Sequence, residues 1–244
     1  MKQRPRIVAA ISFLACLAVV SPAAAYVLPF TPLAHQLQER REQGGARSQV
    51  VGGTLALHGS HGERIIVAAK RTVMAQGLCR LDIVDPSASA LEDAHVIWDG
   101  SRARGSDHSE LSLVKMMESL ACPLSAGGSD ARGMLQDLIN RLGVDRRYTG
   151  YSRLDGRVAY VIGAPPWEMD DPALWLDKET LLPVRAMGSL GGARVDLRML
   201  GYGDLVDGDW HPRVIELRVD GRLALTFQAE RVERDVEISA ALFN

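Results

Sequence analysis

The sequence of 244 residues has no apolar run long enough to cross a membrane. Its longest run, residues 7–20, follows a basic start that contains Lys2, Arg4 and Arg6. A membrane-spanning helix needs about 20 apolar residues, so this run is too short to act as one. Small residues at 21–25 complete the pattern of a secretory signal peptide. We therefore predict a signal peptide over residues 1–25, cleaved after Ala25, and a single domain over residues 26–244.

The predicted export places the mature chain in the periplasm. A lipid anchor at Cys16 is the alternative, although the bulky residues before this cysteine fit a lipidation signal poorly. Loss of the leader removes three basic residues and leaves 25 Lys and Arg against 30 Asp and Glu, a net charge of −5. The mature chain also has no run of basic residues. These features argue against nucleic acid as a partner.

Cysteine is scarce, with three residues in the chain. One of them lies in the predicted leader, which leaves Cys79 and Cys122 in the mature protein. An oxidising compartment permits a disulfide between these two residues, which would stabilise the fold by up to about 4 kcal/mol. Two buried thiols that never meet are the alternative, because the sequence does not place the side chains within bonding distance.

The sequence also lacks the motifs of the common catalytic and cofactor sites. There is no Gly-x-Ser-x-Gly elbow, no phosphate-binding loop and no dinucleotide fingerprint. His58 and His61 are three residues apart, but the glycines around them predict a turn and there is no third ligand at a suitable spacing. Glu168, Asp170 and Asp171 offer paired carboxylates, which an exposed polar loop explains equally well. We therefore predict no catalytic residue, no metal site, no cofactor and no enzymatic activity.

The chain does contain a long series of strands, over residues 157–232. Residues 194–199, 215–219 and 222–228 alternate polar and apolar side chains, as expected for strands with one buried face. Asp155-Gly156 and Asp220-Gly221 favour the positive φ angles of two-residue hairpin turns. This part of the chain is therefore predicted to form an antiparallel meander.

Helices precede this meander. Residues 31–43 predict a first helix, and strands follow near residues 50–57, 64–70 and 73–84. The apolar segment 65–69 has no polar face and is therefore expected in the middle of a sheet. Apolar periodicity predicts two more helices around residues 113–120 and 134–142. The order indicates an α+β fold with its helices gathered on one face of the sheet.

Apolar side chains of the predicted sheet and of the facing helix define one candidate site. Methionine is unbranched and adapts to irregular partners, which suits a cavity for acyl chains. The alternative interpretation of the same residues is an ordinary core. The candidate lining residues are Leu113, Met116, Met117, Leu120, Leu197, Met199, Leu217, Leu223, Leu225 and Phe227.

Two segments of the chain resemble a known family. Residues 174–185, Leu-Trp-Leu-Asp-Lys-Glu-Thr-Leu-Leu-Pro-Val-Arg, and residues 205–212, Leu-Val-Asp-Gly-Asp-Trp-His-Pro, are similar to hairpins of the periplasmic lipoprotein carriers of the LolA/LolB superfamily. The predicted leader and the order of elements also agree. The resemblance implies an incomplete antiparallel β-barrel, formed by a curved sheet and closed by an α-helical lid.

The same resemblance implies a function. A carrier of this kind binds the acyl chains of lipoproteins or other lipids in an apolar cavity, and we expect this protein to be a monomer. It moves them toward the outer membrane without catalysis, and an envelope transport protein is an expected partner. The alternative is a periplasmic regulatory or scaffold module of the same fold that binds another envelope protein.

Overall fold

The computed structural model describes residues 27–44, 46–59, 62–84, 91, 93–125, 131–165, 167–168, 170–203 and 211–244. The predicted signal peptide, its cleavage site at Ala25 and the alternative anchor at Cys16 lie outside these residues. Among the residues described, no helix combines the length and the apolar character that crossing a membrane requires.

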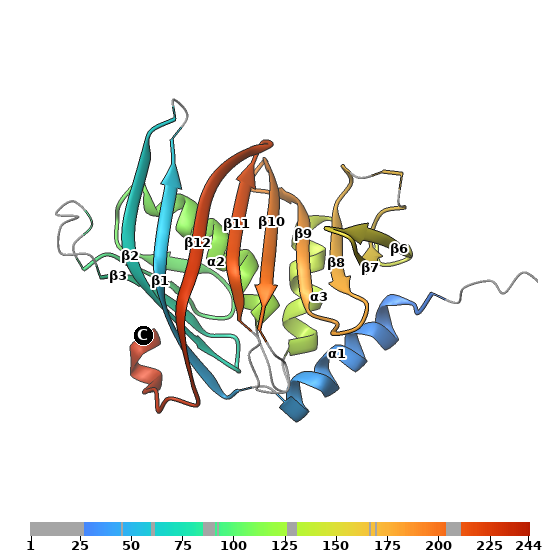
Figure 1. Ribbon diagram of the computed structural model, residues 1–244, viewed down its shortest axis with the longest axis horizontal. Coiled ribbons are helices and arrows are strands. Elements are labelled where there is room, and N and C mark those ends of the chain that lie inside the picture. The colour runs from blue at the N-terminus through green and yellow to red at the C-terminus, as the bar shows by residue number, and fades with distance from the viewer. Residues whose placement is uncertain are drawn as a thin grey trace, which may run out of the picture.

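One antiparallel sheet of twelve strands dominates the structure (Figure 1). Its order is β5-β4-β3-β2-β1-β12-β11-β10-β9-β8-β7-β6, so that β5 and β6 form the two ends and the sheet does not close into a complete barrel. The strands are β1 (Ser48–His58), β2 (Arg64–Met74), β3 (Cys79–Ile83), β4 (His95–Trp98), β5 (Ala103–Gly105), β6 (Thr149–Leu154), β7 (Arg157–Ile162), β8 (Ala173–Asp177), β9 (Pro183–Leu190), β10 (Ala193–Tyr202), β11 (Pro212–Val219) and β12 (Arg222–Arg234).

The predicted turns connect consecutive strands of this sheet. Asp155 and Gly156 have φ angles of 49° and 82°, and Asp220 and Gly221 have φ angles of 49° and 80°. Two successive positive φ angles are the property of a type I′ turn, whose twist matches that of the flanking strands. The carboxylate of Asp177 caps the turn between β8 and β9, where it accepts a hydrogen bond of 2.9 Å from the amide of Thr180. These local signals confirm the predicted meander.

One prediction for the first half of the sheet was wrong, and another was confirmed only in part. The chain over residues 73–84 is not one strand, because β2 continues to Met74 and a turn separates it from β3. The segment 65–69 belongs to β2, which lies between β3 and β1 in the middle of the sheet as predicted, but its side chains are not all covered: Ile65 and Ile66 are 45% and 52% exposed. Register explains this exposure, since β3 pairs with β2 only from Ala69 onward and leaves the start of β2 beside β1 alone among the described strands.

The described part of the chain forms three α-helices, which gather on one side of the sheet and confirm the predicted α+β arrangement. They are α1 (Phe30–Gly44), α2 (Leu111–Ser125) and α3 (Ala131–Leu142), and a 3₁₀-helix, η1 (Ala240–Phe243), ends the chain. In the view of Figure 1, α2 and α3 lie behind the sheet and α1 runs along its lower right side. Helix α2 contacts β4, β5, β10 and β12, and α3 contacts β8 and β9.

The close contact between α3 and β9 depends on a glycine. A Cβ atom added at Gly188 would lie 2.3 Å from the carbonyl oxygen of Leu142, the last residue of α3. Any larger residue would push the helix away from the strand. The sequence of β9 therefore allows α3 to pack directly on the sheet backbone.

The opposite face of the sheet has its own organisation. Leu174 and Leu176 point to the helices, whereas Trp175 points to the other face, where it belongs to a separate apolar cluster. The guanidinium of Arg185 lies 5.7 Å from the centre of the Trp175 ring and binds both carboxylate oxygens of Asp196 at 2.8 Å. Ion pairs thus cover this face where no helix does.

Candidate functional site

The structure brings together nearly all of the residues predicted to line a cavity. Met117 and Leu120 of α2 are fully buried against Leu197, Leu217 and Leu225 of the sheet. The same apolar cluster contains Met199 and Phe227, and Leu113 and Met116 pack against it while partly buried. The cluster therefore occupies the interface between the sheet and the helices. That it binds acyl chains stays a prediction.

Leu223 is the exception among these residues. A β-bulge shifts the pairing of β11 and β12, so that Leu217 faces Leu225 but Arg218 faces Leu223. Leu223 is half-buried and lies outside the apolar cluster. Simple alternation along β12 placed it on the inner face, and a bulge that depends on the partner strand changed that position.

Sequence patterns missed a second group of residues in the same cluster. Val51 and Leu55 of β1 are fully buried there, as are Leu33 and Leu37 of α1. The sequence did predict the elements that carry these residues, a strand near residues 50–57 and a helix over residues 31–43 with an apolar edge. What the sequence alone could not supply is that β1 pairs with β12 and so joins the two halves of the sheet.

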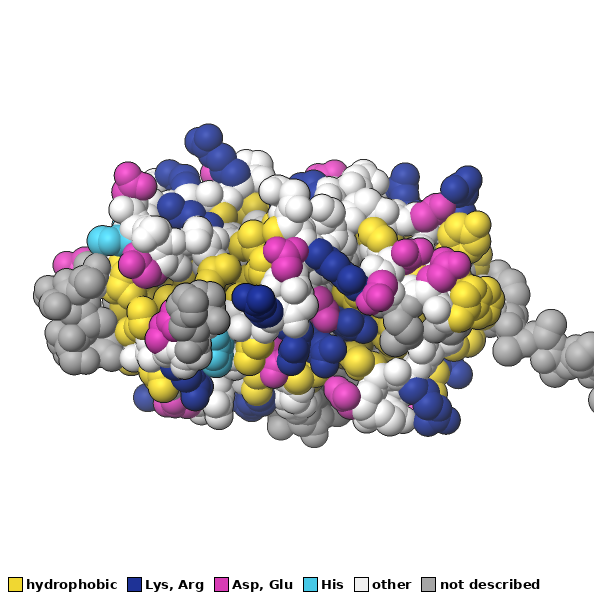
Figure 2. All heavy atoms as spheres, turned by 90° about the horizontal axis from the view of Figure 1, so that it is seen from above, with side chains coloured by type: hydrophobic (Ala, Val, Ile, Leu, Met, Phe, Trp, Pro, Cys, Tyr) yellow, Lys and Arg dark blue, Asp and Glu magenta, His cyan; other side chains and the backbone are white. Residues whose placement is uncertain are grey.

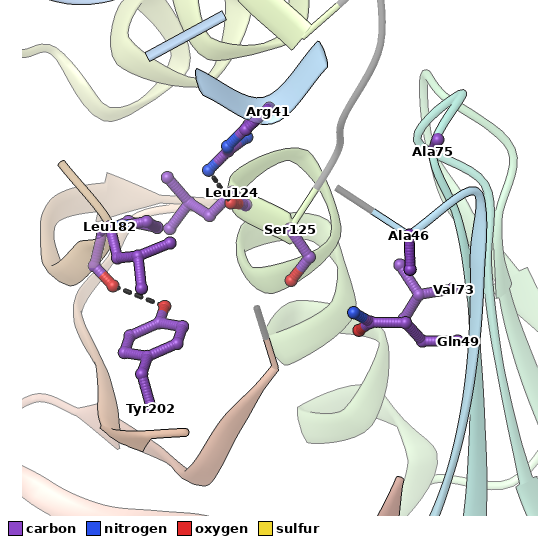
Figure 3. Close-up of a pocket in the computed structure, with 10 residues that line it drawn as sticks. Arg41, Ala46, Gln49, Val73, Ala75, Leu124, Ser125, Leu182 and Tyr202 are labelled. Carbon is purple, nitrogen blue, oxygen red and sulfur yellow. Dashed lines mark hydrogen bonds between the residues drawn. The ribbon is translucent and has the colours of Figure 1, made fainter. Parts of the chain in front are cut away.

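A small cavity of about 30 Å³ lies at one end of this interface, where α1 meets the end of α2 (Figure 3). It is lined by Arg41, Ala46, Gln49, Val73, Ala75, Leu124, Ser125, Leu182, Pro183 and Tyr202. This volume suits one or two water molecules and is far smaller than a typical ligand site. Among the described residues, the apolar side chains of this interface are buried and pack against one another.

Polar side chains hold the walls of the cavity in place. Arg41 donates a hydrogen bond from Nη2 to the carbonyl oxygen of Leu124, at 2.5 Å, and thereby joins α1 to the end of α2. The hydroxyl of Tyr202 donates to the carbonyl oxygen of Pro183 at 2.7 Å. Burial lowers the pKa of Arg41 to about 10 and raises the pKa of Tyr202. Arg41 therefore stays charged and Tyr202 stays neutral at physiological pH.

A buried ion pair fixes α2 to the sheet. Nε and Nη2 of Arg71, on β2, bind the two carboxylate oxygens of Glu118 at 2.8 and 3.0 Å, and both side chains are fully buried. Such a bidentate pair has favourable hydrogen-bond geometry. Loss of one partner is costly, because it leaves an uncompensated charge in the core. The pair therefore favours one position of α2 on the sheet.

His211 completes this polar cluster. Its Nδ1 donates to the carbonyl oxygen of Pro212 at 2.7 Å, so Nε2 accepts from Nη1 of Arg71 at 3.0 Å. Burial, together with the charge of Arg71, lowers the pKa of His211 to about 3. A protonated ring would have no lone pair for Arg71, which agrees with the neutral form.

A disulfide between Cys79 and Cys122 ties the same helix to β3, with an S–S distance of 2.01 Å. Cys79, Cys122 and Glu118 lie close enough to be considered as metal ligands. Both sulfur atoms are committed to the disulfide and Glu118 is committed to Arg71, so this group lacks the thiolates that a zinc site uses. Of the two histidines considered for a metal, His61 lies outside the described residues.

The acidic loop considered for acid–base chemistry shows no catalytic arrangement. Asp170 forms an ion pair with Arg194. Glu168 and Asp171 share a hydrogen bond, which raises the pKa of Glu168. All three side chains are exposed, and the three are not brought together with a nucleophile or a buried base among the described residues.

Comparisons with known proteins identify the class of fold. No family model matches the chain, and no curated protein matches it by sequence. A LolA superfamily protein from Nitrosomonas europaea superposes with a TM-score of 0.51 at 11% identity, covering 86% of this chain and 97% of the other. The structure, an open antiparallel sheet covered by helices, thus resembles this protein in its overall fold.

Two other solved structures show weaker similarity over comparable lengths. A DUF1329 family protein from Desulfovibrio piger has a TM-score of 0.48 at 16% identity and covers 88% of this chain and 97% of its own. A protein from Vibrio parahaemolyticus described as an outer membrane lipoprotein-sorting domain has a TM-score of 0.47 at 12% identity and covers 87% and 95%. The assignment of the fold rests on the first comparison alone.

Proposed function

We propose that this protein is a periplasmic carrier that binds the acyl chains of lipoproteins or other lipids between its sheet and its helices, without catalysis. One observation carries the proposal: predicted lining residues from α2, β10, β11 and β12 converge on a single apolar cluster. They do so in a fold of the LolA superfamily. The predicted leader over residues 1–25 supplies the periplasmic location, and the mature chain then begins at Tyr26.

Binding requires the packed interface to open. Met117 and Leu225 are fully buried in one apolar cluster, and the cavity at the end of this interface measures about 30 Å³, so a ligand must separate the layers. Each CH₂ group of an acyl chain that leaves water contributes about 0.8 kcal/mol. A chain of ordinary length therefore offsets a substantial loss of packing, and methionine side chains adapt to the new partner.

The contacts of the helices indicate which one moves. Helix α2 is held by the disulfide at Cys122 and by the ion pair of Glu118, and both must break if it leaves the sheet. Helix α1 is held by apolar side chains and by hydrogen bonds from Arg40 and Arg41 to the carbonyl oxygens of Glu179 and Leu124. We expect α1 to swing away while α2 stays in place, so that acyl chains enter beside the cavity of Figure 3.

The proposal is tested with a fluorescent fatty acid and three asparagine variants. We expect Met117→Asn and Leu225→Asn to weaken binding of the probe at least tenfold, since each places an amide in the apolar cluster. Thr226→Asn is the matched control, because Thr226 is the neighbour of Leu225 on the opposite face of β12. Thermal melting of all variants separates loss of binding from loss of folding.

The role of α1 has its own test. Arg40→Ala removes a hydrogen bond between α1 and the turn after β8 and should speed the association of the probe. Glu39→Ala, on the same helix, changes an exposed pair with His35 within α1 and should leave the rate unchanged. Equal association rates for both variants would mean that α1 is not the element that opens.

The close packing of the cluster also favours a second candidate, a periplasmic module that binds another envelope protein. In that case the apolar cluster is an ordinary core. The wild type would then bind no acyl probe, and Met117→Asn and Leu225→Asn would only lower the melting temperature. This outcome would replace the carrier proposal with the protein-binding module.

A further inference from the structure

Two large aromatic side chains stand exposed beside one pocket. Tyr148 is 55% exposed and Trp167 is 79% exposed, whereas Trp98 and Trp175 are each 2% exposed. Exposed aromatic residues that gather at one place are characteristic of interaction surfaces. The pocket measures about 520 Å³ and is lined by Gly143, Asp145, Tyr148, Gly163, Pro165, Trp167, Glu168, Asp171 and Pro172. We call it the aromatic pocket.

Backbone hydrogen bonds hold the walls of the aromatic pocket. The amide of Gly163 donates to the carbonyl oxygen of Tyr148 at 3.0 Å, which joins the end of β7 to the segment before β6. The amide of Glu168 donates to the carbonyl oxygen of Pro165 at 3.0 Å, and the amide of Asp171 donates to that of Glu168 at 3.3 Å. These hydrogen bonds constrain the backbone around the aromatic pocket, so that the side chains of Tyr148 and Trp167 project from a hydrogen-bonded backbone.

Every charged residue that lines the aromatic pocket is a carboxylate. Asp145 is already paired with Arg147 at 2.6 Å, and this pairing lowers the pKa of Asp145 to about 2. Glu168 and Asp171 have each other as partners: the hydrogen bond from Asp171 and its negative charge raise the pKa of Glu168. Two adjacent carboxylates repel one another, and a cation placed between them relieves that repulsion.

The sign of the charge decides what the aromatic rings bind. Trp and Tyr also occur where proteins meet membranes, but bacterial and other natural membrane surfaces are anionic and repel a pair of carboxylates. Aromatic faces with carboxylates beside them instead match a cation that can stack. The guanidinium of arginine is planar, stacks on aromatic rings and pairs with carboxylates through two hydrogen bonds, which an ammonium does not do.

We propose that the aromatic pocket docks a basic segment of a partner protein, with an arginine side chain stacked on Trp167 or Tyr148 and paired with Glu168 and Asp171. Figure 2 shows hydrophobic side chains next to acidic ones at the right end of the face seen from above, the end at which Figure 1 places β6, β7 and β8. The site lies apart from the residues proposed to bind acyl chains. The proposal therefore stands whether the cluster between sheet and helices binds lipid or not.

The test measures binding of a fluorescein-labelled hexaarginine peptide to the mature protein by fluorescence anisotropy at low salt. The wild type should bind, and Trp167→Ala should weaken binding about fivefold or more, the size expected for a lost cation–π contact. Trp167→Phe keeps an aromatic face and should retain most of the affinity. Because Trp167→Ala does not change the net charge, its effect separates the pocket from a general attraction to an acidic protein.

Charge variants complete the test. Glu168→Gln should weaken binding of hexaarginine, whereas Asp107→Asn, which removes an exposed carboxylate near the other end of the sheet, should not. Equal affinity of the wild type and Trp167→Ala would overturn the proposal, as would equal effects of Glu168→Gln and Asp107→Asn. Binding of the wild type to phosphatidylglycerol vesicles that depends on Trp167 would also overturn it and would assign the aromatic residues to a membrane surface.

Discussion

The ion pair between Arg71 and Glu118 gives the sharpest test of how α2 is held. Both side chains are fully buried and joined by two hydrogen bonds of 2.8 and 3.0 Å. Glu118→Leu leaves the guanidinium of Arg71 in the core without a counter-charge. Loss of one member of a buried pair costs about 3–5 kcal/mol, so we expect the free energy of unfolding to fall by that amount.

The double variant Arg71→Met/Glu118→Leu should recover much of this loss. Replacing both members of a buried pair by apolar residues is often neutral or stabilising. Here Nε2 of His211 also loses its donor at 3.0 Å, and an unsatisfied buried acceptor costs about 1–3 kcal/mol. We therefore expect the double variant to lie about 1–3 kcal/mol below the wild type and above Glu118→Leu.

Urea unfolding followed by circular dichroism measures these differences through the midpoint and the slope. The disulfide between Cys79 and Cys122 keeps α2 attached to β3, so the single variant should still unfold cooperatively. Glu233→Leu is the control, because its pair with Arg231 is exposed and is worth at most about 1 kcal/mol. A loss below 1 kcal/mol for Glu118→Leu, or a double variant less stable than Glu118→Leu, would refute the argument.

Three further predictions concern the same framework. His211 has a pKa of about 3 in the folded protein, below its value of about 6.5 in the unfolded chain. Its contribution to the free energy of unfolding is therefore complete above pH 6.5 and is smaller by about 2 kcal/mol at pH 5, where the unfolded chain binds a proton that the folded protein does not. His211→Gln should flatten the dependence of unfolding free energy on pH between 6.5 and 5, and an unchanged slope would contradict this. Reduction of the disulfide between Cys79 and Cys122 should lower the free energy of unfolding by up to about 4 kcal/mol, which thermal melting measures. Identical melting temperatures of the oxidised and reduced protein would rule out a stabilising role. Gly188→Val should destabilise by about 1–3 kcal/mol or more because it drives β9 against Leu142, whereas an equal melting temperature would mean that α3 readily moves away.

Local sequence signals were sufficient for much of the second half of the sheet. The Asp-Gly pairs at 155–156 and 220–221 specify their turns because aspartate and glycine adopt positive φ angles at little cost. Alternation in residues 194–199 and 215–219 then specifies which side chains share a face. These are interactions between residues close in sequence, so they could be predicted without the tertiary structure.

The register between strands belongs to the tertiary structure. Leu223 left the predicted inner face because a bulge opposite Arg218 shifts the pairing of β11 and β12. Ile66 is exposed because β3 starts its pairing with β2 three residues further along. Neither outcome follows from the segment itself, since each depends on where a different strand begins.

The sequence by itself determined the alternating strands, the helices and the apolar residues available to cover the sheet, because these follow from local conformation and periodicity. Only the tertiary structure decided that Arg71 meets Glu118, 47 positions away, and that His211, the residue before β11, joins them. It also decided which apolar side chains pack together in one cluster. A buried charge is stable only beside a particular partner, and packing depends on distances that no single segment contains.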